Sequence, residues 1–275
     1  VCVYVMIGGM KAVAYTDVVQ GFLMIGSVIV LVMASLAAVG GFTQMNLQAE
    51  TIAPGMTGVM GVDNIWGPGY SLSFALLFLL SPLGQPSYIA KFFAMKSEKV
   101  ARYAMPLSYT FVFIASVSFP IIGLCARVLH PNLSNPDSAF TVMATSVLPP
   151  VMGAVVLVAL FAAVMSTMDA MFLNITGAVV RDFYEQLLGK KPSQKFLLRA
   201  SVITTVITAV IAYVLTLNTT GAIALIGSMS TGLLGASFSV VVVGGLYSKK
   251  MTTQAAIAAM LAGFFGTVLT TKGVV

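Results

Sequence analysis

The segment LFAAVMSTMDAMF, Leu160–Phe172, places three polar side chains inside an apolar run. An aspartate at the centre of a membrane helix costs about 2.5–3.5 kcal/mol on insertion scales, so it should face protein or water and have a role. In a helix, Ser166 and Asp169 share a face, and Ala163 lies one turn before Ser166. The hydroxyls of Ser166 and Thr167 and the carbonyl of Ala163 would then offer three neutral oxygens. Hard cations such as Na⁺ prefer oxygen ligands, so this spacing predicts a sodium site.

A structural interpretation of the same residues stands beside the ion site. Serine and threonine in membrane helices often donate to the carbonyl one turn earlier or join neighbouring helices. Asp169 could brace the helix or take part in ion binding. Asp17, in the stretch MKAVAYTDVVQG, is the other acid close to an apolar run. It fits either helix capping and dipole pairing or a part in an ion pathway.

A second stretch, LLFLLSPLGQPSYIAK, interrupts another apolar run with Pro82, Gly84 and Pro86. Each proline removes a backbone donor and clashes with the preceding turn, so the helix is expected to kink or open there. At membrane depth an opened turn is tolerated only where protein or a water-filled cavity satisfies its carbonyls. Ser81 and Gln85 are the polar side chains at this depth, so the break predicts a contact with a transported solute. A kinked helix packed against its neighbours is the alternative.

The composition indicates that both stretches belong to an all-α, polytopic membrane protein. Of the 275 residues, 59% are hydrophobic and 8% charged, against about 25% charged in a soluble domain. A helix needs about 20 apolar residues to cross the hydrocarbon core. The chain predicts seven full spans after a truncated one, at 1–9, 18–39, 70–91, 104–129, 151–181, 200–217, 222–247 and 253–269. A short surface helix, capped by Asp137, is expected over Asp137–Pro150.

The basic residues predict the orientation of these spans. By the positive-inside rule, the loops that carry most of them are cytoplasmic. This group comprises Lys11, Lys91, Lys96, Lys99, Arg102, Arg181, Lys190, Lys191, Lys195, Arg199, Lys249 and Lys250, whereas Arg127 and Lys272 fall on the other side. The net charge of +6 therefore reflects membrane topology and gives no nucleic-acid-binding patch.

The reactive side chains argue against several other classes of protein. Cys2 and Cys125 lie far apart in apolar surroundings, and His130 has no cysteine or histidine at ligand spacing. The sequence therefore predicts neither a disulfide framework nor a structural metal, and no organic cofactor. It shows no nucleophile and base constellation, so we expect no enzyme activity. The phosphate-binding glycine and lysine motif of ATP-driven pumps is also absent from the sequence.

Three blocks resemble, in order and spacing, the sodium:solute symporter family of sodium-coupled proline, pantothenate and sugar transporters. They are GGMKAVAYTDVVQGFLMIG (8–26), GQPSYIAKFFAMKSEKVAR (84–102) and LFAAVMSTMDAMFLNITGAVVRDFYE (160–185). The resemblance implies a leucine-transporter-like inverted-repeat core whose first and sixth helices are unwound at mid-membrane. It also implies that 1–275 is a single transmembrane transporter domain, an internal fragment that covers approximately core helices 4 to 11.

The resemblance also implies roles for individual residues. Ala163, Ser166 and Thr167 match the family's sodium ligands on its eighth helix, and Asp17 matches an acid of the ion pathway to the cytoplasm. Asp169 has no matched role. Phe78 and Pro82 match solute-lining positions, to which Ser81 and Gln85 are added from their chemistry. Proline carriers of the family look aromatic where Pro82 stands, which argues against proline as the solute.

These observations together predict a sodium-coupled symporter that imports a small organic solute by alternating access. Its coupling ion would be Na⁺, its partners the solute and the lipid bilayer, and its location the cell (plasma or inner) membrane. The alternative is a sensor, in which the same membrane module is fused to a signalling kinase. The identity of the solute stays open among amino acids, carboxylates, vitamins and sugars.

Overall fold

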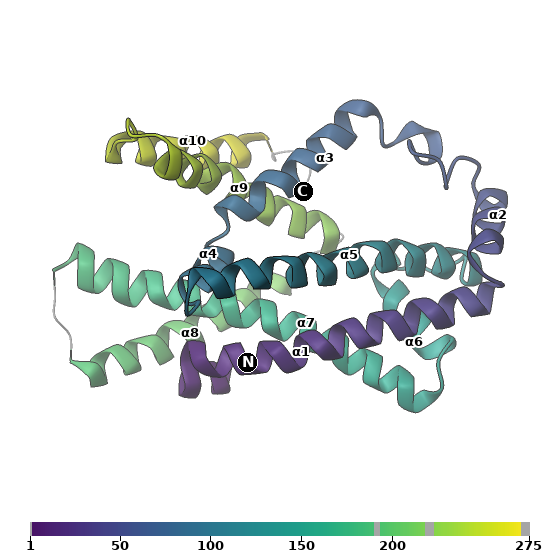
Figure 1. The fold of residues 1–275 in the computed structure, drawn as a ribbon, viewed down its shortest axis with the longest axis horizontal. Coiled ribbons are helices and arrows are strands. Elements are labelled where there is room, and N and C mark those ends of the chain that lie inside the picture. Colours follow the sequence, from purple (N-terminus) through teal and green to yellow (C-terminus); the bar gives the residue numbers. More distant parts are fainter. Residues whose placement is uncertain (1, 190–192, 218–222, 271–275) are drawn as a thin grey trace. The chain divides into compact units, whose positions relative to one another are not determined.

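The computed structural model describes residues 2–189, 193–217 and 223–270. Every regular element within these ranges is helical, and they contain no strand (Figure 1). The predicted all-α class is therefore confirmed. Of the residues named above, Lys190, Lys191 and Lys272 lie outside the described ranges.

Six helices of the described residues are long and apolar enough to cross a membrane, and one bent pair makes a seventh candidate. The six are α1 (Cys2–Val39), α5 (Glu98–Leu129), α7 (Pro150–Gly177), α8 (Gln194–Thr216), α9 (Ile223–Tyr247) and α10 (Thr253–Thr270). The bent pair joins α3 (Pro68–Leu80) and the 3₁₀ turn η2 (Ser81–Gly84) to α4 (Pro86–Phe93). This number agrees with the seven full spans predicted, and the chain is a polytopic membrane protein. The inverted repeat stays a prediction.

The start of the chain differs from the prediction. A separate truncated span at 1–9 is wrong, because α1 runs without a break from Cys2 to Val39. Gly8 and Gly9 each cost a helix only about 1 kcal/mol, and no proline interrupts the stretch. Asp17 therefore lies well inside α1, so the helix-capping interpretation of Asp17 is also wrong.

Shorter helices connect the spans. The sequence analysis missed α2 (Phe42–Ile52), which buries Met45 and Ala49. A 3₁₀ turn, η1 (Val62–Asn64), precedes α3. The short helix expected ahead of α7 is confirmed as η3 (Pro136–Ser138) and α6 (Ala139–Ser146). Its cap is not Asp137: the Asn135 side chain accepts a hydrogen bond from the Asp137 amide at 3.0 Å.

The chain divides into two compact units. The first comprises 1–52 and 97–219, in which α1 packs alongside α5 and α7 (Figure 1). Its core joins α1, α2, α5, α6 and α7 through ten buried side chains. They are Leu31, Val39, Met45, Ile122, Cys125, Ala126, Met143, Ala144, Leu148 and Val156.

One hydroxyl pair adds a polar link inside the first unit, between α7 and α8. Thr205 is buried and donates a hydrogen bond to the Ser201 carbonyl at 2.9 Å. The Thr176 and Thr205 hydroxyl oxygens lie 3.1 Å apart. Since Thr205 has already donated its only hydroxyl proton, Thr176 is the donor of this interhelical bond.

The second unit comprises 53–96 and 220–275. In it α9 packs against η2 and against α10 (Figure 1). Small residues permit both contacts. A Cβ atom on Gly235 would lie 2.9 Å from the Cα of Ser81, and one on Gly263 would collide with the Ala236 carbonyl. The backbones therefore approach more closely than larger side chains would allow.

Candidate ion and solute sites

The two adjacent hydroxyls of α7 converge on one carbonyl oxygen. Ser166 Oγ donates to the Ala163 carbonyl at 3.0 Å, and Thr167 Oγ1 donates to the same oxygen at 3.2 Å. Ala163 and Ser166 are half-buried and Thr167 is exposed. The three predicted oxygens are thus gathered into one cluster, which we call the Ala163 cluster.

The spacing of the Ala163 cluster suits a hard cation. Such ions, Ca²⁺ for example, bind oxygens at about 2.3–2.6 Å, so oxygens that share one ion lie about 3 Å or more apart. Both hydroxyl protons point at the carbonyl in the present arrangement. An ion would turn these protons away and receive the lone pairs instead, with little movement of the oxygens. The structure shows the hydrogen-bonded form of the cluster, and cation binding by it stays a prediction.

Asp169 lies on the buried face of the same helix. Its exposed fraction is 0%, and Ala162 and Phe172 are buried on the same helix at 6% and 4%. Within the first unit, α7 packs against α1 and α8. A carboxylate without solvent contact is costly in an apolar environment, so its presence favours a specific role over simple packing.

Asp17 belongs to α1, the helix that packs alongside α7 in the same unit. It is half-buried, and the preceding Thr16 hydroxyl bonds to the Ala12 and Val13 carbonyls at 3.2 and 3.0 Å. An acid in the interior of a transmembrane helix fits the predicted part in an ion pathway better than an end-capping role. That part stays a prediction.

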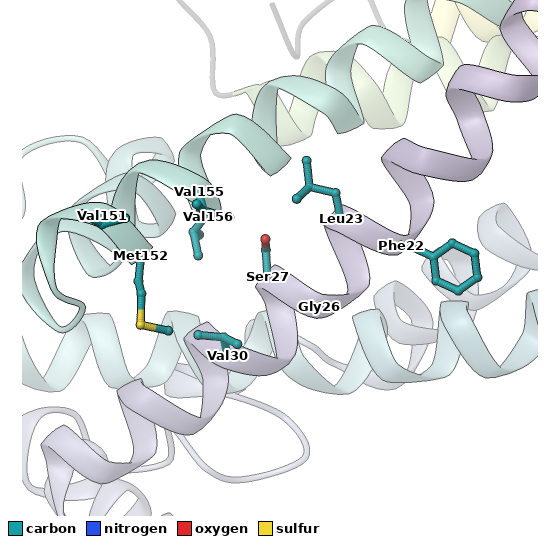
Figure 2. A pocket seen from close by; sticks show the side chains of 9 residues that line it. All are labelled: Phe22, Leu23, Gly26, Ser27, Val30, Val151, Met152, Val155 and Val156. Atoms are coloured by element: carbon teal, nitrogen blue, oxygen red, sulfur yellow. The ribbon is translucent and has the colours of Figure 1, made fainter.

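A cavity of about 330 Å³ opens between α1 and α7, but its lining does not suit an ion (Figure 2). Figure 2 shows Ser27 as the only polar side chain among nine lining residues. The others are Phe22, Leu23, Gly26, Val30, Val151, Met152, Val155 and Val156. Along α7, Val156 precedes Ala163 by seven residues, or about 10 Å. The cavity is therefore separate from the Ala163 cluster.

The predicted helix break is confirmed in the second unit. α3 gives way to a 3₁₀ turn at Ser81, Gln85 is extended (φ −88°, ψ 112°), and α4 starts at Pro86. The two helical segments differ in direction by 44°. The bond from the Gln85 amide to the Pro82 carbonyl is long at 3.4 Å. Weakly paired carbonyls of this kind are available to a polar ligand.

The four predicted solute residues surround this break in different environments. Phe78 and Pro82 are exposed, and Gln85 is half-buried. Ser81 is 3% exposed, because it packs against Gly235 of α9. Phe78, Pro82 and Gln85 are therefore accessible to a solute at the break. Ser81 instead packs against α9. Their role in solute binding stays a prediction.

The sequence analysis missed the part of α9 that holds the break. A Cβ atom on Gly84 would lie 2.7 Å from the Ser239 amide nitrogen and 2.9 Å from the Leu234 carbonyl oxygen. Ser239 is buried at 7%. The spacing of Gly232, Gly235 and Ser239 is a signal that could have indicated a close helix contact.

The fold is all-helical and polytopic, with a carbonyl and hydroxyl cluster on one span and a proline-broken second span. Broken helices of this kind occur in secondary transporters. A model of the sodium:solute symporter family matches residues 1–263. The chain belongs to this family, and it is an integral protein of the cell membrane.

Several curated relatives are similar over nearly the whole chain. The sodium/pantothenate symporter of Haemophilus influenzae is 28% identical, over 98% of this chain and 56% of its own length. The high-affinity proline transporter PutP of Bacillus subtilis is 26% identical, over 96% and 56%. The sodium/proline symporter of Escherichia coli is 28% identical, over 94% and 53%. The chain thus spans about half the length of the curated relatives it matches.

Proposed function

We propose that the protein is a sodium-coupled symporter that imports a small organic solute by alternating access. The observation that carries this proposal is the convergence of the Ser166 and Thr167 hydroxyls on the Ala163 carbonyl. Family membership and relatives named for sodium, proline and pantothenate support it. The relatives reported above are named as symporters or transporters, and no observation favours the sensor alternative.

In this proposal the Ala163 cluster binds Na⁺ during each transport cycle. Neutral oxygens attract the ion less strongly than a set of carboxylates would, which permits its release on the other side of the membrane. Asp17 and Asp169 supply negative charge along α1 and α7. The broken helix contributes Phe78, Pro82 and Gln85 to the solute site, with Ser81 as the residue that seats the turn.

The test replaces the two hydroxyls in protein reconstituted in liposomes. Ser166→Ala and Thr167→Ala should each raise the Na⁺ concentration for half-maximal uptake. A lost contact to a charged group is worth about 1.5 kcal/mol, which corresponds to roughly tenfold. Uptake of a labelled panel that includes proline, pantothenate, a sugar and a carboxylate, with and without a sodium gradient, would identify the solute.

Thr110→Ala is the matched control for these variants. The Thr110 hydroxyl also bonds to a carbonyl one turn earlier, that of Pro106 at 2.8 Å, but it shares this oxygen with no neighbouring hydroxyl in the structure. Its replacement should leave the Na⁺ dependence unchanged. An unchanged Na⁺ dependence in the Ser166 and Thr167 variants would exclude the Ala163 cluster as the coupling site.

A further inference from the structure

Four aromatic side chains follow one another along α3 and the residues before it. Trp66, Tyr70, Phe74 and Phe78 are spaced four residues apart, and within α3 each of the last three lies about one turn beyond the previous one. The ring centroids of Trp66 and Tyr70 lie 5.0 Å apart. Those of Tyr70 and Phe74 lie 6.1 Å apart, and those of Phe74 and Phe78 lie 4.9 Å apart. These are distances of ring contact. Trp66 also contacts Phe74, with ring centroids 5.3 Å apart, so the first three rings form one cluster that Phe78 extends. We call these four connected rings the aromatic ladder.

An aromatic belt at the membrane surface does not account for the whole ladder. Tryptophan and tyrosine are enriched at headgroup level, which would explain Trp66 and Tyr70 alone. Phe78 lies eight residues beyond Tyr70, about 12 Å further along the helix. The ladder ends one turn before Ser81, where the helix breaks. It therefore connects the start of α3 with the predicted solute residue Phe78.

The loop before α3 is built to hold the first ring. Gly61 has φ 67°, and a Cβ atom there would lie 2.8 Å from Trp66 Cδ1, so the indole rests on a backbone that only glycine permits. The Trp66 amide donates to the Met60 carbonyl at 2.9 Å. The Ser71 hydroxyl donates to the Trp66 carbonyl at 2.9 Å. These contacts fix the ring before a ligand arrives.

The same loop carries the only charge in this part of the chain. Asp63 is the single charged residue between Ala53 and Ala90, and its side chain is exposed. Asp63 and Asn64 both have positive φ, 52° and 56°, at a cost of roughly 1–2 kcal/mol each. The positive-inside rule, with Lys91 in the last turn of α4 and Lys96 just beyond that helix, places this end of α3 outside the cell.

We propose that Asp63 and the aromatic ladder form an outer subsite for a solute that carries a positively charged ammonium group. The negative face of an aromatic ring attracts cations, and aromatic side chains recognise quaternary ammonium groups. Na⁺ prefers oxygen ligands instead, so the ladder suits the solute and not the coupling ion. Asp63 adds attraction for a cation and repels a free carboxylate anion such as pantothenate. This inference rests on the proposed function, because the ladder leads to that function's solute site.

The first experiment uses Trp66, the only tryptophan of the 275 residues, as a probe. The protein is placed in vesicles of phosphatidylglycerol, a lipid without an ammonium headgroup, and titrated with tetramethylammonium chloride. Saturable quenching of the Trp66 fluorescence is expected, with none from sodium chloride at the same concentration. Addition of phosphatidylcholine vesicle lipid tests whether a headgroup competes for the subsite.

Variants then separate a binding site from a membrane anchor. Asp63→Asn and Tyr70→Leu should weaken tetramethylammonium binding at least fivefold. Tyr213→Leu is the matched control, because Tyr213 is a 65% exposed tyrosine near the end of α8. This variant should bind as the unchanged protein does. Equal effects of Tyr70→Leu and Tyr213→Leu, or the absence of saturable quenching, would overturn the proposal.

Uptake provides the second measurement. In Trp66→Leu, the KM for labelled choline or proline should rise at least fivefold, with little change in maximal rate or in Na⁺ dependence. The ammonium preference would be contradicted if pantothenate were taken up faster than both choline and proline and if Asp63→Asn left this uptake unchanged. Absence of sodium-driven uptake for every solute would instead defeat the proposed function, whereas the fluorescence titration still decides whether the ladder binds ammonium.

Discussion

At the scale of single residues, the proposed ion site is built from an ordinary kind of hydrogen bond. Serine and threonine hydroxyls in membrane helices often bond to a carbonyl one turn earlier. At Thr16 one hydroxyl reaches two carbonyls, those of Ala12 and Val13. At Ala163 two hydroxyls reach one carbonyl. Both arrangements gather oxygens from three residues, but only the second brings two hydroxyl oxygens to one carbonyl oxygen.

Asp169 gives the first prediction at this scale. Asp169→Asn retains the shape of a fully buried side chain and removes its charge. If the charge takes part in coupling, the Na⁺ concentration for half-maximal uptake should rise by roughly tenfold, equivalent to about 1.4 kcal/mol. Expression and thermal stability should change little, because burial of a neutral amide costs less than burial of a carboxylate. Uptake in proteoliposomes over a range of Na⁺ concentrations measures the effect.

Asp182→Asn serves as the control for Asp169→Asn. Asp182 lies in the π-helical continuation of α7 (Ala178–Leu187) and its side chain is exposed. The same chemical change there should leave Na⁺ dependence as it was. A loss of expression or stability in Asp169→Asn without any shift in Na⁺ dependence would make Asp169 a structural residue.

At the scale of elements, the sequence predicted features that depend on local chemistry. The prolines of the LSPLGQPS stretch located the helix break, since a missing donor and a steric clash act within one turn. The length and composition of the apolar runs located the spans. Ser166 and Thr167 were paired from helical spacing alone. These features require no knowledge of which helices are neighbours.

Features that depend on distant contacts escaped prediction. The burial of Ser81 against Gly235, more than 150 residues later in the chain, could not be read from the sequence. Its predicted contact with the solute stays a prediction. α2 was missed because only Met45 and Ala49 of its eleven residues are buried. Asp17 was taken for a possible cap because it lies next to the start of the span predicted at 18–39, yet α1 begins at Cys2 and runs through it.

The close contact between η2 and Gly235 of α9 gives a prediction for the stability of the helix break. In Gly235→Ala the new Cβ would lie 2.9 Å from Ser81 Cα and 3.0 Å from Ser81 Cβ, so α9 and η2 must separate. Overpacking of this kind costs about 1–3 kcal/mol. The thermal midpoint of the purified protein in detergent should therefore fall.

Gly245→Ala is the control in the same helix. A Cβ atom on Gly245 meets nothing within 4 Å, and alanine favours a helix over glycine by about 1 kcal/mol. Its thermal midpoint should stay the same or rise. Equal stability of the two variants would show that η2 does not rest on Gly235.

At the scale of the whole molecule, the candidate ion and solute sites belong to different parts of the chain. The Ala163 cluster lies in the first compact unit and the helix break in the second. A symporter requires that the two sites communicate, and the physical form of this communication is a coupling free energy. Coupling is reciprocal, so whatever factor Na⁺ contributes to solute affinity, the solute must contribute to Na⁺ affinity.

This reciprocity gives the last prediction. Equilibrium binding of the labelled solute identified by the uptake panel should tighten as Na⁺ is added, typically by 5–150-fold, or about 1–3 kcal/mol. Saturating solute should tighten Na⁺ binding by the same factor. K⁺ at equal ionic strength should have no such effect, which distinguishes specific Na⁺ binding from charge screening.

In Ser166→Ala and Thr167→Ala the Na⁺-dependent gain in solute affinity should shrink. Solute affinity without Na⁺ should not change, because the variants alter the ion site alone. Solute binding that is indifferent to Na⁺ in the unchanged protein would mean that the two units are not coupled and that the protein is not a sodium symporter.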